Sequence, residues 1–174
     1  MQDDTVPEEI DHERWMRQAL NEAMDAAEEG EVPVGAVVVY ENRIIGRGHN
    51  RTVATHDPSA HAEILALGAA GAAVGDWRLT GVDIYVSLEP CAMCAGAIQL
   101  GRLRRAVFGP RDPKFGGCGS VLDVLREPRL NHQVEVIEGV MAAESQHLLK
   151  EFFRRLRAKD RVPATPDPFP NAGE

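Results

Sequence analysis

Two short segments carry the side chains best suited to chemistry. They are His61-Ala62-Glu63 and Pro90-Cys91-Ala92-Met93-Cys94, about thirty residues apart. One imidazole and two thiolates make a three-ligand zinc site, and such a site leaves the fourth position open for water. An open position is typical of a catalytic zinc and not of a structural one. We therefore predict one Zn²⁺ held by His61, Cys91 and Cys94.

Glu63 follows the predicted imidazole ligand closely and need not bind the metal. Zinc lowers the pKa of bound water from about 16 to about 7, which makes hydroxide available as a nucleophile near neutral pH. Two thiolates cancel the charge of the ion, so a separate base should assist the reaction. A carboxyl group whose pKa is raised toward neutrality suits that task. We predict that Glu63 is the catalytic proton carrier.

Other interpretations of the cysteine pair stay open. A C-x-x-C pair alone is also found in redox sites and in structural zinc sites. A structural site needs a fourth protein ligand, and Cys118 is the only other cysteine. It lies in Gly116-Gly117-Cys118-Gly119, which has the composition of a loop. We expect Cys118 to be a small loop thiol that can be exposed, and not a ligand.

Helix starts are expected to position both segments. Asp57-Pro58-Ser59 predicts a turn and an N-cap, and the range 60–70 predicts a short helix that carries His61. Pro90 suits the first position of a helix, where its missing N–H costs nothing. The two cysteines would then lie in the first turn with both sulfurs on one face, where the helix dipole favours thiolate.

Helical and extended hydrophobic patterns alternate along the chain. The Gly- and Ala-rich stretch 68–75 is predicted to be a loop. This order predicts an α/β fold, a three-layer α/β/α domain with a central mixed sheet of about five strands. The second metal segment directly follows a strand, which places the site at the carboxyl edge of that strand. Helices are predicted over 12–29, 60–70, from 91 onward and over 141–159, and strands over 34–40, 44–49, 82–88, 105–108 and 134–138.

Length and composition indicate one domain in a reducing compartment. Of the 174 residues, 1–162 are predicted to form a single domain, with 1–11 as a flexible acidic arm and the Pro-rich tail 163–174 disordered. Three cysteines, two of them in one motif, argue against a disulfide framework. There is no secretory pattern at the N-terminus and no apolar run long enough to span a membrane. We expect a cytoplasmic protein with no membrane partner.

The charge is unevenly distributed. The net charge is −8, but residues 1–31 hold eleven acidic and two basic side chains, so the rest of the chain sums to +1. Arg111 and Lys114 belong to one basic group, and a second lies in 150–161 with Arg154, Arg155 and Arg157. Either group could contact phosphates, or both could be solvated faces. We predict RNA contacts for these five residues, and we expect the neighbouring Phe152 and Phe153 to pack into the core.

Beyond the metal segments, the chain resembles the bacterial tRNA-specific adenosine deaminases, within the cytidine deaminase-like superfamily. H-x-E followed by P-C-x-x-C is the signature of zinc-dependent nucleoside and nucleobase deaminases in general. The tRNA enzymes are indicated by further segments between about residues 15 and 157. These are E-V-P-V-G-A at 31–36, G-H-N-R at 48–51, H-D-P at 56–58, L-E-P-C-A-M-C-A-G-A at 88–97, F-G-P-R-D-P-K at 108–114, G-S at 119–120, N-H at 131–132 and F-F-R at 152–154.

This resemblance implies a reaction and roles for single residues. The reaction is hydrolytic conversion of the wobble adenosine of a tRNA anticodon loop to inosine, with release of ammonia, by a homodimer. A zinc-bound hydroxide would attack the base, while Glu63 delivers protons to the ring nitrogen and the departing amine. By motif position, Asn50 would hydrogen-bond the flipped base, and Asp112 would lie near the sugar and backbone of its nucleotide. The base pocket would be lined by Val34, Ala62 and Leu88.

Two other functions stay open. The first is a deaminase of a free base or nucleoside, of the guanine or cytosine type, which would turn over a small molecule without RNA. The second is a zinc-stabilised binding protein without catalysis, in which loss of Glu63 would leave every function intact.

Overall fold

The computed structural model describes residues 10–159, so most of the predicted acidic arm and all of the predicted disordered tail lie outside the described residues. The expected helices and strands are present, and α2 is an addition that the sequence did not predict. The helices are α1 (His12–Glu28), α2 (Thr52–Thr55), α3 (Ala62–Val74), α4 (Ala92–Leu100) and α5 (Ala142–Lys159). The strands are β1 (Gly35–Tyr40), β2 (Arg43–His49), β3 (Asp83–Val86), β4 (Arg105–Phe108) and β5 (Glu135–Ile137).

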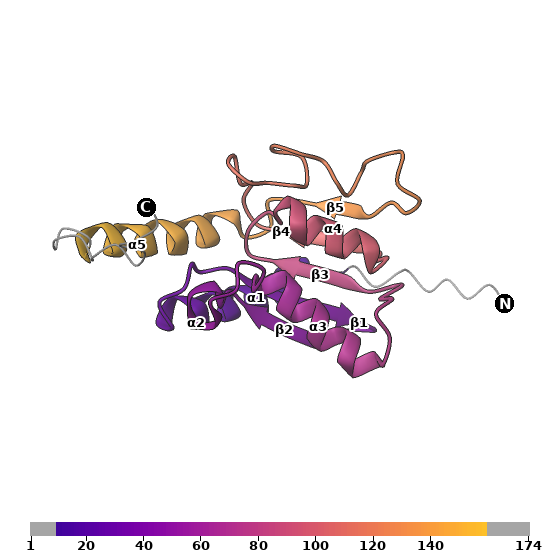
Figure 1. The fold of residues 1–174 in the computed structure, drawn as a ribbon, viewed down its shortest axis with the longest axis horizontal. Helices are drawn as coiled ribbons and strands as arrows, with labels where there is room; N and C mark the ends of the chain where they lie inside the picture. The colour runs from indigo at the N-terminus through magenta and orange to yellow at the C-terminus, as the bar shows by residue number, and fades with distance from the viewer. Residues whose placement is uncertain (1–9, 160–174) are drawn as a thin grey trace, which may run out of the picture.

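The strands form one mixed sheet in the order β2-β1-β3-β4-β5. β1 is antiparallel to both of its neighbours, whereas β3, β4 and β5 run parallel to one another. Helices α3 and α4 cover one face of the sheet and α1 covers the other (Figure 1). The predicted three-layer α/β/α architecture is confirmed.

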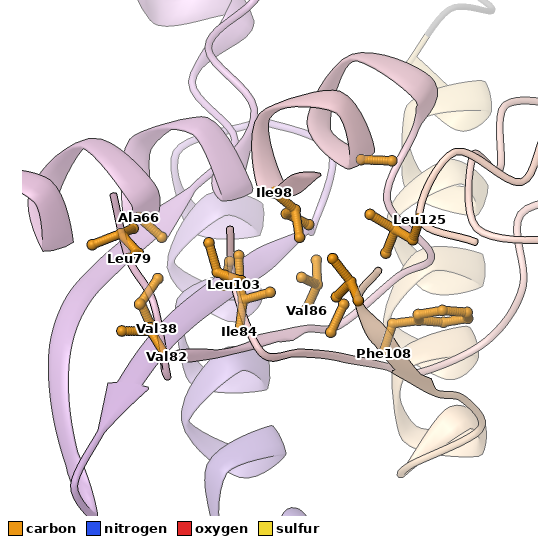
Figure 2. Close-up of a cluster of buried hydrophobic side chains, with 14 of the residues drawn as sticks. Val38, Ala66, Leu79, Val82, Ile84, Val86, Ile98, Leu103, Phe108 and Leu125 are labelled. Carbon is orange, nitrogen blue, oxygen red and sulfur yellow. The ribbon is translucent and has the colours of Figure 1, made fainter. Parts of the chain in front are cut away.

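Successive side chains of a strand point to opposite faces, and each face of this sheet buries its own apolar cluster. On the α3 and α4 face, Val38, Ile84 and Val86 pack against Ala66 and Ile98 (Figure 2). On the other face, the alternate strand residues pack against α1, and this second cluster is made of Trp15, Met16, Ala19, Leu20, Val37, Val39, Tyr85 and Val107. The sheet is therefore buried on both sides.

The prediction of a loop over 68–75 is wrong, because α3 continues to Val74 and ends at Gly75, whose φ is 74°. Alanine is the best helix former, and Ala66 and Ala70 are fully buried. An added Cβ at Gly46 of β2 would overlap the backbone of α3, so helix and strand lie in close contact. This packing offsets the low helix propensity of the glycines in the stretch.

Helix α5 leaves the sheet soon after it begins. The Ser145 hydroxyl donates to the Ser87 carbonyl oxygen and joins the first turns to β3, and the rest of the helix projects beyond the sheet (Figure 1). The expectation that Phe152 and Phe153 pack into the core is wrong, since Phe152 is half-buried and Phe153 is 39% exposed. None of the described helices is long and apolar enough to cross a membrane.

Replacing Gly46 by alanine is expected to destabilise the fold. The added Cβ would meet the Ala66 carbonyl oxygen and lie 2.8 Å from the Ala70 amide nitrogen, so α3 would have to move. Overpacking of this kind costs about 1–3 kcal/mol in the free energy of unfolding. Gly96→Ala is the matched control, because Gly96 lies within α4 with nothing within 4 Å of the added Cβ. That control should gain roughly 0.5–1 kcal/mol, and denaturant unfolding that showed equal losses for both variants would contradict this packing.

Candidate active site and metal centre

Three side chains that could bind a metal ion, the predicted ligands, meet beyond the carboxyl end of β3. Nδ1 of His61 lies 3.6 Å from the sulfur of Cys91 and 3.6 Å from the sulfur of Cys94. All three ligand atoms lie within 4.8 Å of one another. A tetrahedral zinc with Zn–N near 2.0 Å and Zn–S near 2.3 Å holds nitrogen and sulfur ligands about 3.5 Å apart. The donor set and its spacing therefore fit one zinc ion.

Each of the two helices begins at a ligand. His61 is the N-cap of α3 and Cys91 is the N-cap of α4, both with extended backbone. The predictions that Ser59 caps the first helix and that Pro90 opens the second are wrong, because each helix starts later than expected. Asp57 does form the predicted turn, as its Oδ1 accepts the Ser59 N–H at 2.8 Å. Because the backbone of His61 is extended, the fixed rotation between successive helical residues does not apply to it. Its side chain can therefore face the same site as a residue of the first helical turn.

Hydrogen bonding between the two ligand thiols has opposite effects on them. The thiol of Cys94 lowers the pKa of Cys91 to about 4, and the His61 ring adds to this effect. The same hydrogen bond, with burial, raises the pKa of Cys94. Without a metal, Cys91 is therefore a thiolate at neutral pH and stabilises the protonated form of His61, whose pKa is raised.

Glu63 lies in the first turn of α3 and is only 3% exposed. Burial is the main cause that raises its pKa to about 7, and the negative charge of Cys91 adds to it. The His61 ring and the Cys94 thiol act in the opposite direction and lower the pKa of Glu63. A carboxyl group with such a pKa can both accept and release a proton near neutral pH.

Three of the predicted base-pocket residues meet beside His61, the N-cap of α3. Asn50 is buried at the end of β2, and its backbone N–H donates to the Val34 carbonyl oxygen at 3.1 Å. Its side-chain Oδ1 accepts the Ala62 N–H at 3.0 Å. Asn50, Val34 and Ala62 are thus brought together beside His61. Leu88 is half-buried, packs against the core under α3 and α4, and lies between β3 and Cys91.

The predicted sugar and RNA contacts come from the segment after β4 and from α5. Asp112 is half-buried, and its Oδ1 accepts the backbone N–H groups of Lys114 and Phe115 at 2.9 and 3.3 Å. Arg111 is paired with Glu138 at 2.7 Å, and Arg154 is paired with Glu151 at 2.9 Å. Three of the predicted RNA contacts are exposed side chains outside these pairs, namely Lys114, Arg155 and Arg157.

Two buried carboxylates beside the site were missed by sequence reasoning. Glu31 accepts the backbone N–H groups of Val53 and Ala54 at 3.1 and 2.8 Å, and so caps α2. Glu89 accepts hydrogen bonds from the segment after β4. Glu31 precedes β1 and Glu89 follows β3, and each comes shortly before a proline, in E-V-P and E-P. No local pattern separates these two glutamates from exposed ones, so the sequence alone does not reveal them.

Cys118 is separate from the ligand triad. It is buried, and its sulfur lies 3.8 Å from the Pro90 carbonyl oxygen. The prediction of a loop thiol outside the metal site agrees with this position, but the expected exposure is wrong. Burial raises the pKa of the Cys118 thiol, which keeps it protonated.

A mixed sheet with a His/Cys/Cys triad and a buried carboxyl group at one edge defines a deaminase of the cytidine deaminase-like class. The family model of the MafB19-like deaminases matches residues 10–157. A solved structure from a study of A-to-I editing by tRNA:A34 deaminases has a TM-score of 0.76 at 44% identity, over 78% of this chain and 99% of that chain. A guanine deaminase from Nitrosomonas europaea has a TM-score of 0.70 at 26% identity, over 80% of this chain and 83% of that chain.

Curated relatives define the family more narrowly. The tRNA-specific adenosine deaminase of Bacillus subtilis (strain 168) is 48% identical over 150 residues, which is 86% of this chain and 93% of the relative. That of Agrobacterium fabrum is 44% identical over 146 residues, 84% of this chain and 96% of the relative. This chain belongs to the tRNA-specific adenosine deaminase family.

Cys94→Ala is expected to abolish tight metal binding, because two remaining protein ligands make an incomplete zinc site. Cys118→Ala is the matched control, since it removes a buried thiol that lies outside the triad. Metal analysis of the purified proteins should find close to one zinc per chain in the control and almost none in Cys94→Ala. Full zinc content in the Cys94 variant would show that the triad is not the metal site.

Proposed function

We propose that this enzyme hydrolyses the wobble adenosine of a tRNA anticodon loop to inosine, with zinc as its cofactor. The observation that carries the proposal is the buried Glu63 beside His61, Cys91 and Cys94 in a chain of this family. The deaminase domain is taken to span 1–162. Reduced thiol ligands and a tRNA substrate both fit a cytoplasmic location.

The chemistry needs one water molecule and a carrier for its protons. When bound by the triad, zinc supplies a water molecule of lowered pKa at the open position. Glu63 accepts a proton as the water oxygen bonds to C6 of the base, and passes it to the ring nitrogen N1. It then carries a second proton to the exocyclic nitrogen, which leaves as ammonia while the carbonyl group of inosine forms. A pKa of about 7 for Glu63 suits both directions of transfer.

The base is taken to be held by the residues that surround Ala62. Oδ1 of Asn50 is engaged by the Ala62 N–H, so the NH₂ group of the same amide is left to donate to an acceptor on the base. Val34, Ala62 and Leu88 provide apolar walls, and Asp112 lies at the sugar side. Chemistry on a base requires it out of its stack, which costs least in a single-stranded loop.

The RNA backbone is proposed to be contacted by the exposed cations Lys114, Arg155 and Arg157. Phosphate contacts of this kind position the substrate without reading its sequence. Arg111 and Arg154 can join them only by exchanging a carboxylate partner for a phosphate, because each is already ion-paired. We regard these two as weaker contacts than the other three.

A homodimer is proposed on the resemblance and on one apolar surface. An open groove of about 630 Å³ lies between the outer sides of α3 and α4 and is lined by Leu67, Trp77 and Leu100 among others. Trp77 is 61% exposed and Leu100 is 71% exposed. Exposed apolar surface of this kind marks contact sites between proteins. A second copy of the chain is the occupant that the family resemblance implies.

Deamination of free guanine is the second candidate function. It is favoured by the similarity to the guanine deaminase structure, at 26% identity. The higher identity to relatives named tRNA-specific adenosine deaminase, 48% in one case, favours the first candidate.

Glu63→Ala is expected to keep its zinc and to lose at least about a hundredfold in turnover, as is typical for removal of a general base. Zinc content and single-turnover rates, measured on the same preparation, separate loss of metal from loss of proton transfer. A variant that retained both zinc and turnover would show that Glu63 is not the proton carrier. A wild-type protein without turnover, whose RNA binding the variant retained, would favour a binding protein without catalysis.

A comparison of three substrates tests the function directly. Zinc-loaded protein is given an anticodon stem-loop with adenosine at the wobble position, free adenosine, and guanine. We expect inosine in the stem-loop alone, because the small substrates lack the RNA contacts that position the base. Ammonia from guanine or adenosine with the RNA unchanged would instead establish a small-molecule deaminase.

A further inference from the structure

Glu89 is a buried carboxylate with no part in the proposed reaction. It is 3% exposed and lies between β3 and the ligand Cys91. Oε1 accepts the backbone N–H groups of Cys118 and Ser120 at 3.0 and 3.1 Å. Oε2 accepts the Asp112 N–H at 2.8 Å and the Ser120 hydroxyl. A buried charge must be satisfied by polar neighbours, and all four donors here come from the single loop 112–120.

This loop fits around Glu89 without spare room. A Cβ on Gly116 would overlap the Glu89 carboxyl group. The Gly117 N–H donates to the Pro90 carbonyl oxygen at 2.8 Å, and Gly116 forms an isolated bridge with Cys91. The position of the loop is therefore set by the same short segment that supplies a metal ligand.

The outer side of the loop presents a cation and an aromatic ring. Phe115 is 72% exposed, and the turn closed by Asp112 Oδ1 fixes the backbone of both Lys114 and Phe115. A cavity of about 300 Å³ beside them is also lined by Cys91 and Met93, so this surface adjoins the metal site. An aromatic face stacks on an unpaired base of any sequence, and a neighbouring lysine suits its phosphate.

We propose that Glu89 is a positioning residue that holds loop 112–120 so that Phe115 stacks on a nucleotide next to the target adenosine. Lys114 would pair with the phosphate of that nucleotide. The proposal rests on the proposed RNA substrate. A single-stranded RNA is favoured over a second protein copy, because the ring is flanked by a cation and is continuous with the site that receives the nucleotide. A glutamine at 89 could not replace the carboxylate, since its NH₂ group would face N–H donors.

The test measures KM and kcat for the wobble stem-loop. Glu89→Gln is expected to raise KM about tenfold, with kcat within about twofold and zinc content equal to the wild type. Phe115→Ala, an exposed change that should not disturb folding, is expected to raise KM by a similar factor. Because Glu89 acts through the loop, the double variant should show little more than the larger single effect.

Asp83→Asn is the matched control for lost stability. Asp83 is also buried and is paired with Arg104 at 2.7 Å, but it lies at the opposite end of β3. This control should lower the melting temperature and leave KM unchanged. An equal rise of KM in Asp83→Asn, or fully additive effects of Glu89→Gln and Phe115→Ala, would overturn the positioning role.

The failures of the two proposals can be told apart. A wild-type protein that deaminates the stem-loop, together with an unchanged KM in Glu89→Gln, would overturn the role of Glu89 alone. A wild-type protein inactive on the stem-loop would overturn the proposed function and the inference with it. Sedimentation velocity that showed loss of an assembly in Phe115→Ala would assign Phe115 to a contact between copies and overturn base stacking.

Discussion

Close contact between α3 and β2 is the constraint on which the site depends. Glycines at 46 and 48 let the backbone of α3 approach the strand, because any Cβ there would overlap the helix. The alanines of α3 make the same approach possible from the other side. A helix seated this closely has little freedom to shift, since protein interiors are packed as densely as crystals. His61 at its N-cap is consequently held at a distance from Cys91 and Cys94 that suits a metal ion.

Three buried glutamates near the site show how the local environment gives the same type of side chain different roles. Glu31 and Glu89 accept backbone N–H groups and so fix nearby loops. Glu63 is instead desolvated by burial, and the pKa of its carboxyl group rises to about 7. The side chains of Glu31 and Glu89 thus each accept several hydrogen bonds. The glutamate proposed to move protons is left with its pKa near neutrality.

The fold could be predicted well from the sequence where hydrophobic periodicity and metal-ligand chemistry indicate the same elements. It could be predicted less well where tertiary packing determines the structure. The alternation of strands and helices, and the His61, Cys91 and Cys94 triad, follow from patterns local to each segment. The extent of α3 does not, because its glycines indicate a loop until the contact with β2 is known. The exposure of Phe153 was missed for the same reason, since a local pattern does not show that α5 extends past the sheet. Glu89 could not be assigned because its four donors lie 23 to 31 residues further along the chain.

The use of N-cap positions for metal ligands has a consequence for the amount of enzyme in a cell. N-cap side chains normally accept a backbone N–H of the first helical turn, but neither His61 nor Cys91 makes such a bond. The starts of α3 and α4 would therefore depend on the metal ion that we propose to join them. A ligand that binds only the folded state stabilises it by about 4 kcal/mol at a thousandfold excess over its dissociation constant. If zinc is the ion, as we propose, zinc starvation would lower the half-life of the protein together with its activity, and tRNA editing would then follow the metal supply through protein turnover.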